Sequence, residues 1–433
     1  MVQLTGGWVQ KLLGRARNSS YLRHNIIYFS GSFGISVLNY LYYPVLGRLM
    51  VPANFGEVQT IISFFLQAAV FLQVLGLISI GIIRKYDDEG QRDRLVQEFF
   101  RISFYIGVAA TVLLIIGASW LRGYFHFNSA APFIALALSL LVSVPGAFAN
   151  SFLQGHHRFG ALARSGLISA GGKLIFSTIL VLLGWQAFGA IFGIVLAQSL
   201  ALVYALSRSR GGFNFLRTGL AIRKPNFNLI KPELGYAALA LSATLTINVL
   251  LSLDVLVIKH LFNPTQAGLY AGISTIGRIV FFITGPLAIV LMPSVKPGRV
   301  SHNRQLLVRS LALSLLLGGG SLLVFSLAPK LVITILLGAK YLTYANLLPR
   351  LSAAIFLLSV GNLLVYYSVA SRYYLAALFA PASLLLGAIL IQMFHANFVA
   401  IINDLIIAAV VLILLLAVRI LWPASSSTKE ATS

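Results

Sequence analysis

The sequence predicts an all-α integral membrane protein with about twelve transmembrane helices, arranged as two six-helix lobes related by a parallel internal repeat. Hydrophobic residues make up 58% of the 433 residues and charged residues only 10%, whereas soluble domains carry roughly 25% charged residues. About twelve stretches stay apolar over the roughly 20 residues that a helix needs to cross a bilayer. The third observation is that the second half of the chain repeats the pattern of the first.

The repeat relates positions 212 residues apart, and each copy has an apolar run, a Pro-x-x-x-Gly turn and a second apolar run. Leu38, Leu41, Val45, Leu49, Pro52, Gly56 and Ile61 recur as Leu250, Leu253, Val257, Leu261, Pro264, Gly268 and Ile273. Six predicted spans separate the copies, and an even number restores the orientation of the chain in the membrane. Duplicated hydrophobic halves of this kind are typical of secondary transporters.

The predicted spans divide the chain into two lobes with polar segments around them. They lie near 25–46, 57–83, 99–120, 131–153, 165–184, 185–207, 234–261, 268–293, 307–328, 345–370, 373–394 and 397–421. The N-lobe is then 25–207 and the C-lobe 234–421, with a basic cytoplasmic or interfacial tail over 1–24, a basic cytoplasmic linker over 208–233 and a disordered cytoplasmic tail over 422–433. Two spans abut at Trp185, where we expect Gly184 and Gln186 to form a tight turn.

The distribution of basic residues predicts the topology. Of the 32 Lys and Arg residues, 24 fall on alternate loops or termini, and only six on the other loops. Because Lys and Arg are retained in cytoplasmic loops, both termini are predicted to be cytoplasmic. The net charge of +22 is then mostly topological, and no nucleic-acid partner is expected.

Enzyme chemistry finds little support in the sequence. The chain has no cysteine, and His156 and His157 lie in a short loop without a carboxylate at ligand spacing. We therefore expect no metal, no cofactor and no catalytic residue. The predicted outer loops are no longer than mere connections, which counts against a membrane-embedded glycan-assembly enzyme. Such an enzyme, or a scaffold, is kept as an alternative from another functional class.

After the charges assigned to loops and span ends are set aside, the ionisable residues left in the predicted spans are Lys173, Asp254, Arg278, Asp404 and, near the end of its span, Lys259. A charge at the centre of a membrane helix costs roughly 2.5–3.5 kcal/mol, so such residues usually face a partner or a watery cavity. Lys173 and Arg278 fall close to the predicted midplane, one in each half. They either form a cationic cavity for an anionic, phosphate-bearing substrate, or Arg278 pairs with Asp254 and Lys173 snorkels to headgroups.

Polar residues on the same predicted helices are candidates for the lining of a cavity, although such side chains also join helices by hydrogen bonds. These candidates are Asn39, Tyr42 and Asn248, together with Asp254 and Lys259. The first half has no acidic residue within a span apart from Glu57, which sits at the outer end of the second span. Because exporters of organic cations need buried carboxylates, this counts against efflux of a small amphiphile, which is kept as the alternative within transport.

Four segments resemble the polysaccharide transporter family, the Wzx-type lipid-linked oligosaccharide flippases of the multidrug/oligosaccharidyl-lipid/polysaccharide exporter superfamily. They are Tyr43-Pro44-Val45-Leu46-Gly47-Arg48-Leu49 with Phe55-Gly56, Asp254-Val255-Leu256-Val257-Ile258-Lys259-His260 with Ala267-Gly268-Leu269-Tyr270, Gln154-Gly155-His156-His157-Arg158-Phe159, and Leu336-Leu337-Gly338-Ala339-Lys340-Tyr341. The segments are spread over the whole chain, and they are moderately specific together and weak singly.

The resemblance implies alternating access, which moves undecaprenyl-diphosphate-linked repeat units from the inner to the outer leaflet of the bacterial inner membrane for surface polysaccharide. It also implies that the protein contacts membrane lipids, and that polysaccharide polymerase and chain-length proteins are candidate partners. Matched to this sequence, Arg48 and Arg278 fall where such proteins often carry basic residues, and with Lys173 they are the predicted substrate-binding cations. The related lipid II flippases usually have two further C-terminal helices, so we do not expect a role in peptidoglycan synthesis.

Overall fold

The fold is built from helices that follow one another along the chain. The computed structural model describes residues 20–85, 88–209, 231–295, 300–371 and 374–421. The helices are α2 Ser20–Leu49, α3 Pro52–Lys85, α4 Glu89–Tyr124, α5 Ala131–Gly155, α6 Phe159–Leu180, α7 Gln186–Arg208, α9 Lys231–Leu261, α10 Pro264–Gly277, α11 Ile279–Ser294, α12 Val300–Leu327, α13 Pro329–Leu336, α14 Leu348–Ala370, α15 Tyr374–Met393 and α16 Phe398–Leu421. Short helical turns cover Val181–Trp185 and Ala339–Leu347.

The predicted fold class is confirmed, since every regular element in the described residues is helical. Nine helical segments of these residues are long and apolar enough to cross a membrane, and one of them, Phe159–Arg208, contains both α6 and α7. The short helices α10 and α11 together form another, Pro264–Met292. The predicted spans thus correspond to α2 to α7, α9, the pair α10 and α11, α12, α14, α15 and α16.

The predicted turn at Trp185 is also confirmed. Gly184 and Gln186 both have positive φ, at 89° and 45°. Glycine adopts such angles without a steric penalty, so the chain reverses between α6 and α7 within a few residues. Three predicted segments lie wholly or partly outside the described residues: the N-terminal tail up to residue 19, linker residues 210–230 and the C-terminal tail from 422.

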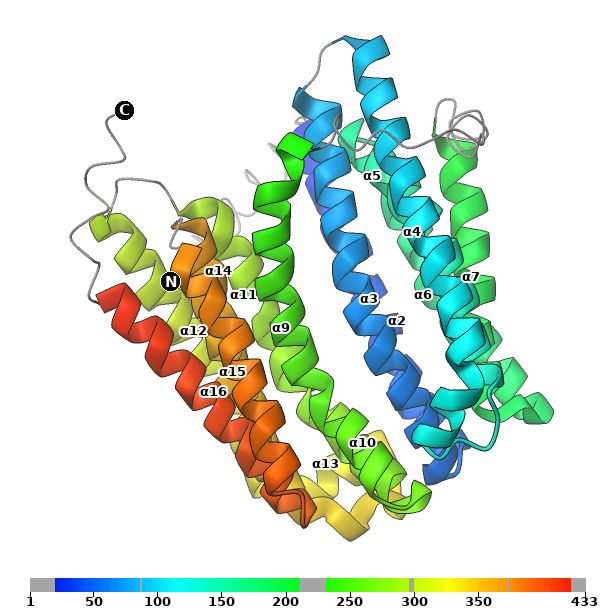
Figure 1. Cartoon of the computed structure of the whole chain (residues 1–433), viewed down its shortest axis with the longest axis vertical. Helices are drawn as coiled ribbons and strands as arrows, with labels where there is room; N and C mark the ends of the chain where they lie inside the picture. The colour runs from blue at the N-terminus through cyan, green and yellow to red at the C-terminus, as the bar shows by residue number, and fades with distance from the viewer. Residues whose placement is uncertain (1–19, 86–87, 210–230, 296–299, 372–373, 422–433) are drawn as a thin grey trace, which may run out of the picture. The chain divides into compact units, whose positions relative to one another are not determined.

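The described helices form two compact units, which we describe separately (Figure 1). The first holds the chain up to Leu46, then Leu75–Ala118 and Ala131–Lys231. Its most extensive packing joins α6 to α7 and α5 to α7, where small residues are buried on α7: Ala187, Ala190, Ala197 and Ala201. Small side chains let membrane helices approach closely, which gives strong van der Waals packing.

The second unit holds Gly47–Val74, Ser119–Ala130 and the chain from Pro232 onward. Its packing centres on α14, which contacts α11 and α16, while α15 packs on α16. A cluster of buried apolar residues joins these helices and includes Leu363, Ala380, Leu412 and Leu416. The lobe boundaries 25–207 and 234–421 stay a prediction.

Candidate functional site: predicted cations and their partners

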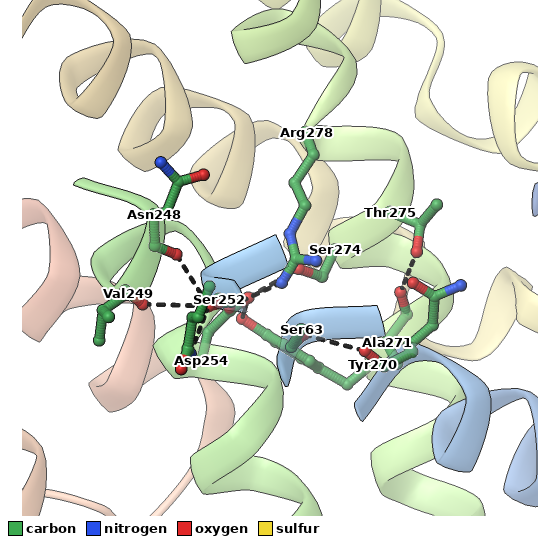
Figure 2. Close-up of polar contacts among 12 residues, drawn as sticks. Ser63, Asn248, Val249, Ser252, Asp254, Tyr270, Ala271, Ser274, Thr275 and Arg278 are labelled. Atoms are coloured by element: carbon green, nitrogen blue, oxygen red, sulfur yellow. Dashed lines mark hydrogen bonds and ion pairs between the residues drawn. The ribbon is translucent and has the colours of Figure 1, made fainter. Parts of the chain in front are cut away.

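A polar cluster in the second unit centres on Asp254 of α9, which is completely buried (Figure 2). Its Oδ1 accepts a hydrogen bond from Arg278 Nη2 at 3.3 Å. Its Oδ2 accepts from the hydroxyls of Tyr270 at 3.0 Å and Ser274 at 2.7 Å. One carboxylate thus receives three donors, and its charge is balanced by one guanidinium.

The sequence of α10 explains why these three donors meet. Tyr270, Ser274 and Arg278 are four residues apart, so they lie on one helical face, and Arg278 is the residue at which α10 ends and α11 begins. The four-residue spacing is visible in the sequence, but Tyr270 and Ser274 were not among the predicted site residues. The ion pair that the sequence left open for Arg278 and Asp254 is present, whereas substrate binding by Arg278 stays a prediction.

Lys173 of α6, in the first unit, has a different partner. Its Nζ lies 4.5 Å from the centre of the Tyr42 ring and 6.0 Å from that of Tyr43. A cation at this distance from an aromatic face is attracted by the ring quadrupole. Among the described residues no carboxylate forms an ion pair with Lys173, so its charge is held against an aromatic surface.

A hydrogen bond to α7 holds the side chain of Tyr42 in place. Its ring is completely buried, and its hydroxyl donates to the carbonyl of Ala190 on α7 at 3.1 Å. The same carbonyl accepts from Ser177 of α6 at 2.7 Å. The two hydroxyls therefore join α2, α6 and α7 at one point, next to Lys173.

Arg48, the third predicted cation, lies at the end of a helix in the second unit. Its Nη2 donates to the carbonyls of Thr334 and Ile335 in the last turn of α13. In return Lys340 Nζ donates to the carbonyls of Arg48, at 3.0 Å, and Met50 at the end of α2. Cations at helix C-termini satisfy open carbonyls and complement the helix dipole. The structure thus places Arg48 in a reciprocal capping pair.

Lys259 lies beside an acidic residue in the second unit. Lys259 is 1% and Glu57 4% exposed, and these two charges interact electrostatically. Lys259 Nζ lies 5.0 Å from the centre of the Phe127 ring and has no hydrogen-bond partner among the described residues. The carboxylate of Glu57 accepts the backbone N–H of Asn128 at 2.9 Å. Glu57 and Phe127 were not among the predicted site residues.

The remaining candidates lie apart from these clusters. Asn248 donates to the carbonyl of Thr244 in its own helix at 2.9 Å, and Asn39 is half-buried on α2. Asp404 is 4% exposed, and its Oδ2 has no hydrogen-bond partner in the described part of the chain. A cavity lined by Asn39, Tyr42, Asn248, Asp254 and Lys259 stays a prediction. In the described residues, no group of three or more His, Asp or Glu side chains is placed to hold a metal ion.

The two repeated Pro-x-x-x-Gly turns face each other in the second unit. A Cβ atom added to Gly268 would lie 1.8 Å from the carbonyl oxygen of Pro52, and one added to Gly56 would lie 2.8 Å from the Cα of Gly268. Only glycine permits such an approach of two backbones. The equivalent turns of the duplicated halves thus meet directly, and we call this contact the glycine seam.

Known proteins resemble this chain in two ways, by a family match in sequence and by similar solved folds. Residues 22–296 match the family described as polysaccharide biosynthesis protein, and no curated protein matches. An inward-facing multidrug resistance MATE family transporter of the MOP superfamily is 15% identical, with a TM-score of 0.68 over 94% of this chain and 99% of that chain. The lipid II flippase MurJ, in an inward closed conformation, is 14% identical, with a TM-score of 0.68 over 91% of this chain and 87% of that chain.

A third similar structure is a MOP superfamily transporter from Pyrococcus furiosus, 14% identical with a TM-score of 0.53 over 92% of this chain and 93% of that chain. At these identities the structures establish the fold and nothing finer. The family match covers more than half of the chain. The protein is therefore a multi-pass membrane member of the polysaccharide biosynthesis protein family, with the fold of the MOP superfamily transporters.

Proposed function

We propose that this protein is a flippase that moves undecaprenyl-diphosphate-linked oligosaccharide repeat units from the inner to the outer leaflet of the bacterial inner membrane. The units would serve the assembly of a surface polysaccharide such as O-antigen, capsule or exopolysaccharide. Membership of the polysaccharide biosynthesis family and a fold shared with a lipid II flippase support this proposal. The process is transport by alternating access, without covalent chemistry, and both termini are cytoplasmic.

The observation that carries the proposal is the state of Lys173. It lies within a long apolar segment, its ammonium group lies over the rings of Tyr42 and Tyr43, and it forms no ion pair with the described residues. A buried charge is costly unless an opposite charge offsets its desolvation. The diphosphate of a lipid-linked sugar would supply that charge through charge-assisted hydrogen bonds, so Lys173 is the first residue that we assign to the substrate.

Arg278 and Arg48 keep the same proposed role in a later step of the cycle, because each has a partner in the present structure. Arg278 would have to leave Asp254, and Arg48 would have to leave the end of α13. Alternating access would also require the two repeated turns to move relative to each other, because they are in direct contact at the glycine seam. Polymerase and chain-length proteins are the partners proposed to receive the product.

The test is transport of a labelled polyprenyl-diphosphate sugar by the purified full chain in proteoliposomes. We expect Lys173→Gln to lower the rate about tenfold, which corresponds to about 1.4 kcal/mol, while Lys173→Arg keeps part of it. Lys330→Gln is the matched control, since Lys330 is exposed on α13. In cells, Lys173→Gln should leave the membrane level unchanged and cause the lipid-linked precursor to accumulate. Transport of amphiphilic dyes in place of the lipid would overturn the proposal in favour of efflux.

A further inference from the structure

A cavity of about 640 Å³ that is open to the surface lies at the beginning of α12, in the second unit. Figure 1 labels this helix. Its lining comprises Ser301, Arg304, Gln305, Val308 and Arg309, and all five are exposed. None of the candidate cations described above belongs to it. The cavity therefore combines two guanidinium groups, an amide and a hydroxyl with one apolar side chain.

An exposed apolar surface continues from this cavity along the same helix. Ser301–Leu327 is the least buried of the nine candidate membrane segments, with 17% of its most apolar window buried. Val308, Leu315 and Leu316 are 57%, 64% and 70% exposed. At a rise of 1.5 Å per residue, Val308 and Leu316 lie about 12 Å apart along the axis, close to the roughly 15 Å depth of one leaflet's hydrocarbon.

The charges of the cavity select among lipid headgroups. The sequence of α12 contains no Asp or Glu, and neither Arg304 nor Arg309 pairs with an acidic residue in the described part of the chain. Two guanidinium groups suit a phosphate, because each planar fork donates two hydrogen bonds. The ammonium group of a zwitterionic lipid would be repelled, whereas the hydroxyls of a glycerol headgroup would find partners in Gln305 and Ser301.

We propose that this cavity is a binding site for an anionic phospholipid of the phosphatidylglycerol type. The phosphate lies between Arg304 and Arg309, and one acyl chain follows the exposed stripe past Val308 to Leu316. The lipid bound here would be a resident lipid on the exposed face of α12. It is not the lipid that is transported. This site does not depend on the function proposed above.

Native mass spectrometry of the full chain in detergent tests this site. Wild-type protein should retain phosphatidylglycerol about tenfold better than phosphatidylethanolamine, and Arg304→Gln combined with Arg309→Gln should abolish that preference. The matched control is Arg94→Gln combined with Arg164→Gln, which removes two exposed charges from other helices and should keep it.

Three outcomes would overturn the proposal. The first is an equal loss in the control, which would indicate general attraction of anionic lipid to a basic protein. The second is an unchanged preference in the Arg304 and Arg309 variant. The third is displacement of phosphatidylglycerol by an equimolar amount of farnesyl diphosphate, which would assign the cavity to the polyprenyl diphosphate substrate.

Discussion

Position 42 in the first repeat and position 254 in the second are equivalent by the 212-residue register, and each holds a residue that meets a cation. In the first copy Tyr42 offers its ring to Lys173 at 4.5 Å. In the second copy Asp254 accepts from Arg278 at 3.3 Å. The equivalent positions of the two copies thus both meet a cation, which comes from α6 in the first copy and from the end of α10 in the second. The first cation lies against an aromatic quadrupole and the second pairs with a full negative charge.

The difference follows from the helix that comes next in each copy. In the second copy Tyr270, Ser274 and Arg278 supply donors from one face of α10. The equivalent positions of the first copy are Val58, Ile62 and Leu66, which have no donor to offer a carboxylate. The helix that follows α2 in the first copy therefore offers, at these positions, none of the hydrogen bonds that an interior charge requires. The comparison shows that Arg278 is paired with a carboxylate in the described residues and that Lys173 lies against aromatic rings.

The largest effect is expected from breaking the charge pair of the second copy. Arg278→Leu should lower the stability of the protein by about 3–5 kcal/mol, because Asp254 would remain as a buried and unpaired charge. Thermal unfolding of the detergent-purified chain measures this loss, and Arg350→Leu, at an exposed residue, is the control. Adding Asp254→Asn should recover part of the loss. A stable Arg278→Leu protein that fails in transport would instead assign Arg278 to the substrate.

A smaller effect is expected at the glycine seam, where the two copies meet. Gly268→Ala should cost about 1–3 kcal/mol, since its Cβ cannot fit against the Pro52 carbonyl without a backbone shift. Gly56→Ala should cost less, because its Cβ would lie 2.8 Å from the nearest atom. Gly117→Ala has nothing within 4 Å and should be neutral or stabilising by less than about 1 kcal/mol. Equal unfolding temperatures for the three variants would contradict the close backbone contact that defines the glycine seam.

The smallest effect concerns the hydroxyl of Tyr42. Tyr42→Phe should cost about 0.5–1 kcal/mol, because the Ala190 carbonyl still accepts from Ser177 and the ring beneath Lys173 is kept. Its transport rate should stay near that of the wild type, whereas Tyr42→Leu, which removes the ring, should approach the rate of Lys173→Gln. A Tyr42→Phe protein of normal stability without transport would show that the hydroxyl, and not the ring, positions Lys173.

The helical fold and the turn at Trp185 are predictable from the sequence because both depend on local properties. Span lengths follow from hydrophobicity, and the turn follows from Gly184, which accepts positive φ. The candidate site was predicted less completely. The pairing of Arg278 with Asp254 was foreseen as an alternative, but Tyr270 and Ser274 were overlooked although their four-residue spacing marks the same face.

Other partners had no sequence signal that would identify them. Arg48 meets Thr334, and Lys173 meets Tyr42, at sequence separations of 286 and 131 residues. Hydrophobic patterns define which face of a helix is buried but not which helix covers it. Several arrangements of the same helices would bury comparable apolar area, so the pattern alone does not choose between them.

The sequence by itself determined that this chain is a duplicated bundle of membrane helices with a few charges inside it. Apolar length and basic loops suffice for that, because the bilayer imposes helical hydrogen bonding on every span. The tertiary structure decided how those charges are compensated, by placing Asp254 within reach of Arg278 and the Tyr42 ring next to Lys173. Compensation depends on contacts of a few ångströms between distant segments, and such contacts are fixed only when the helices pack.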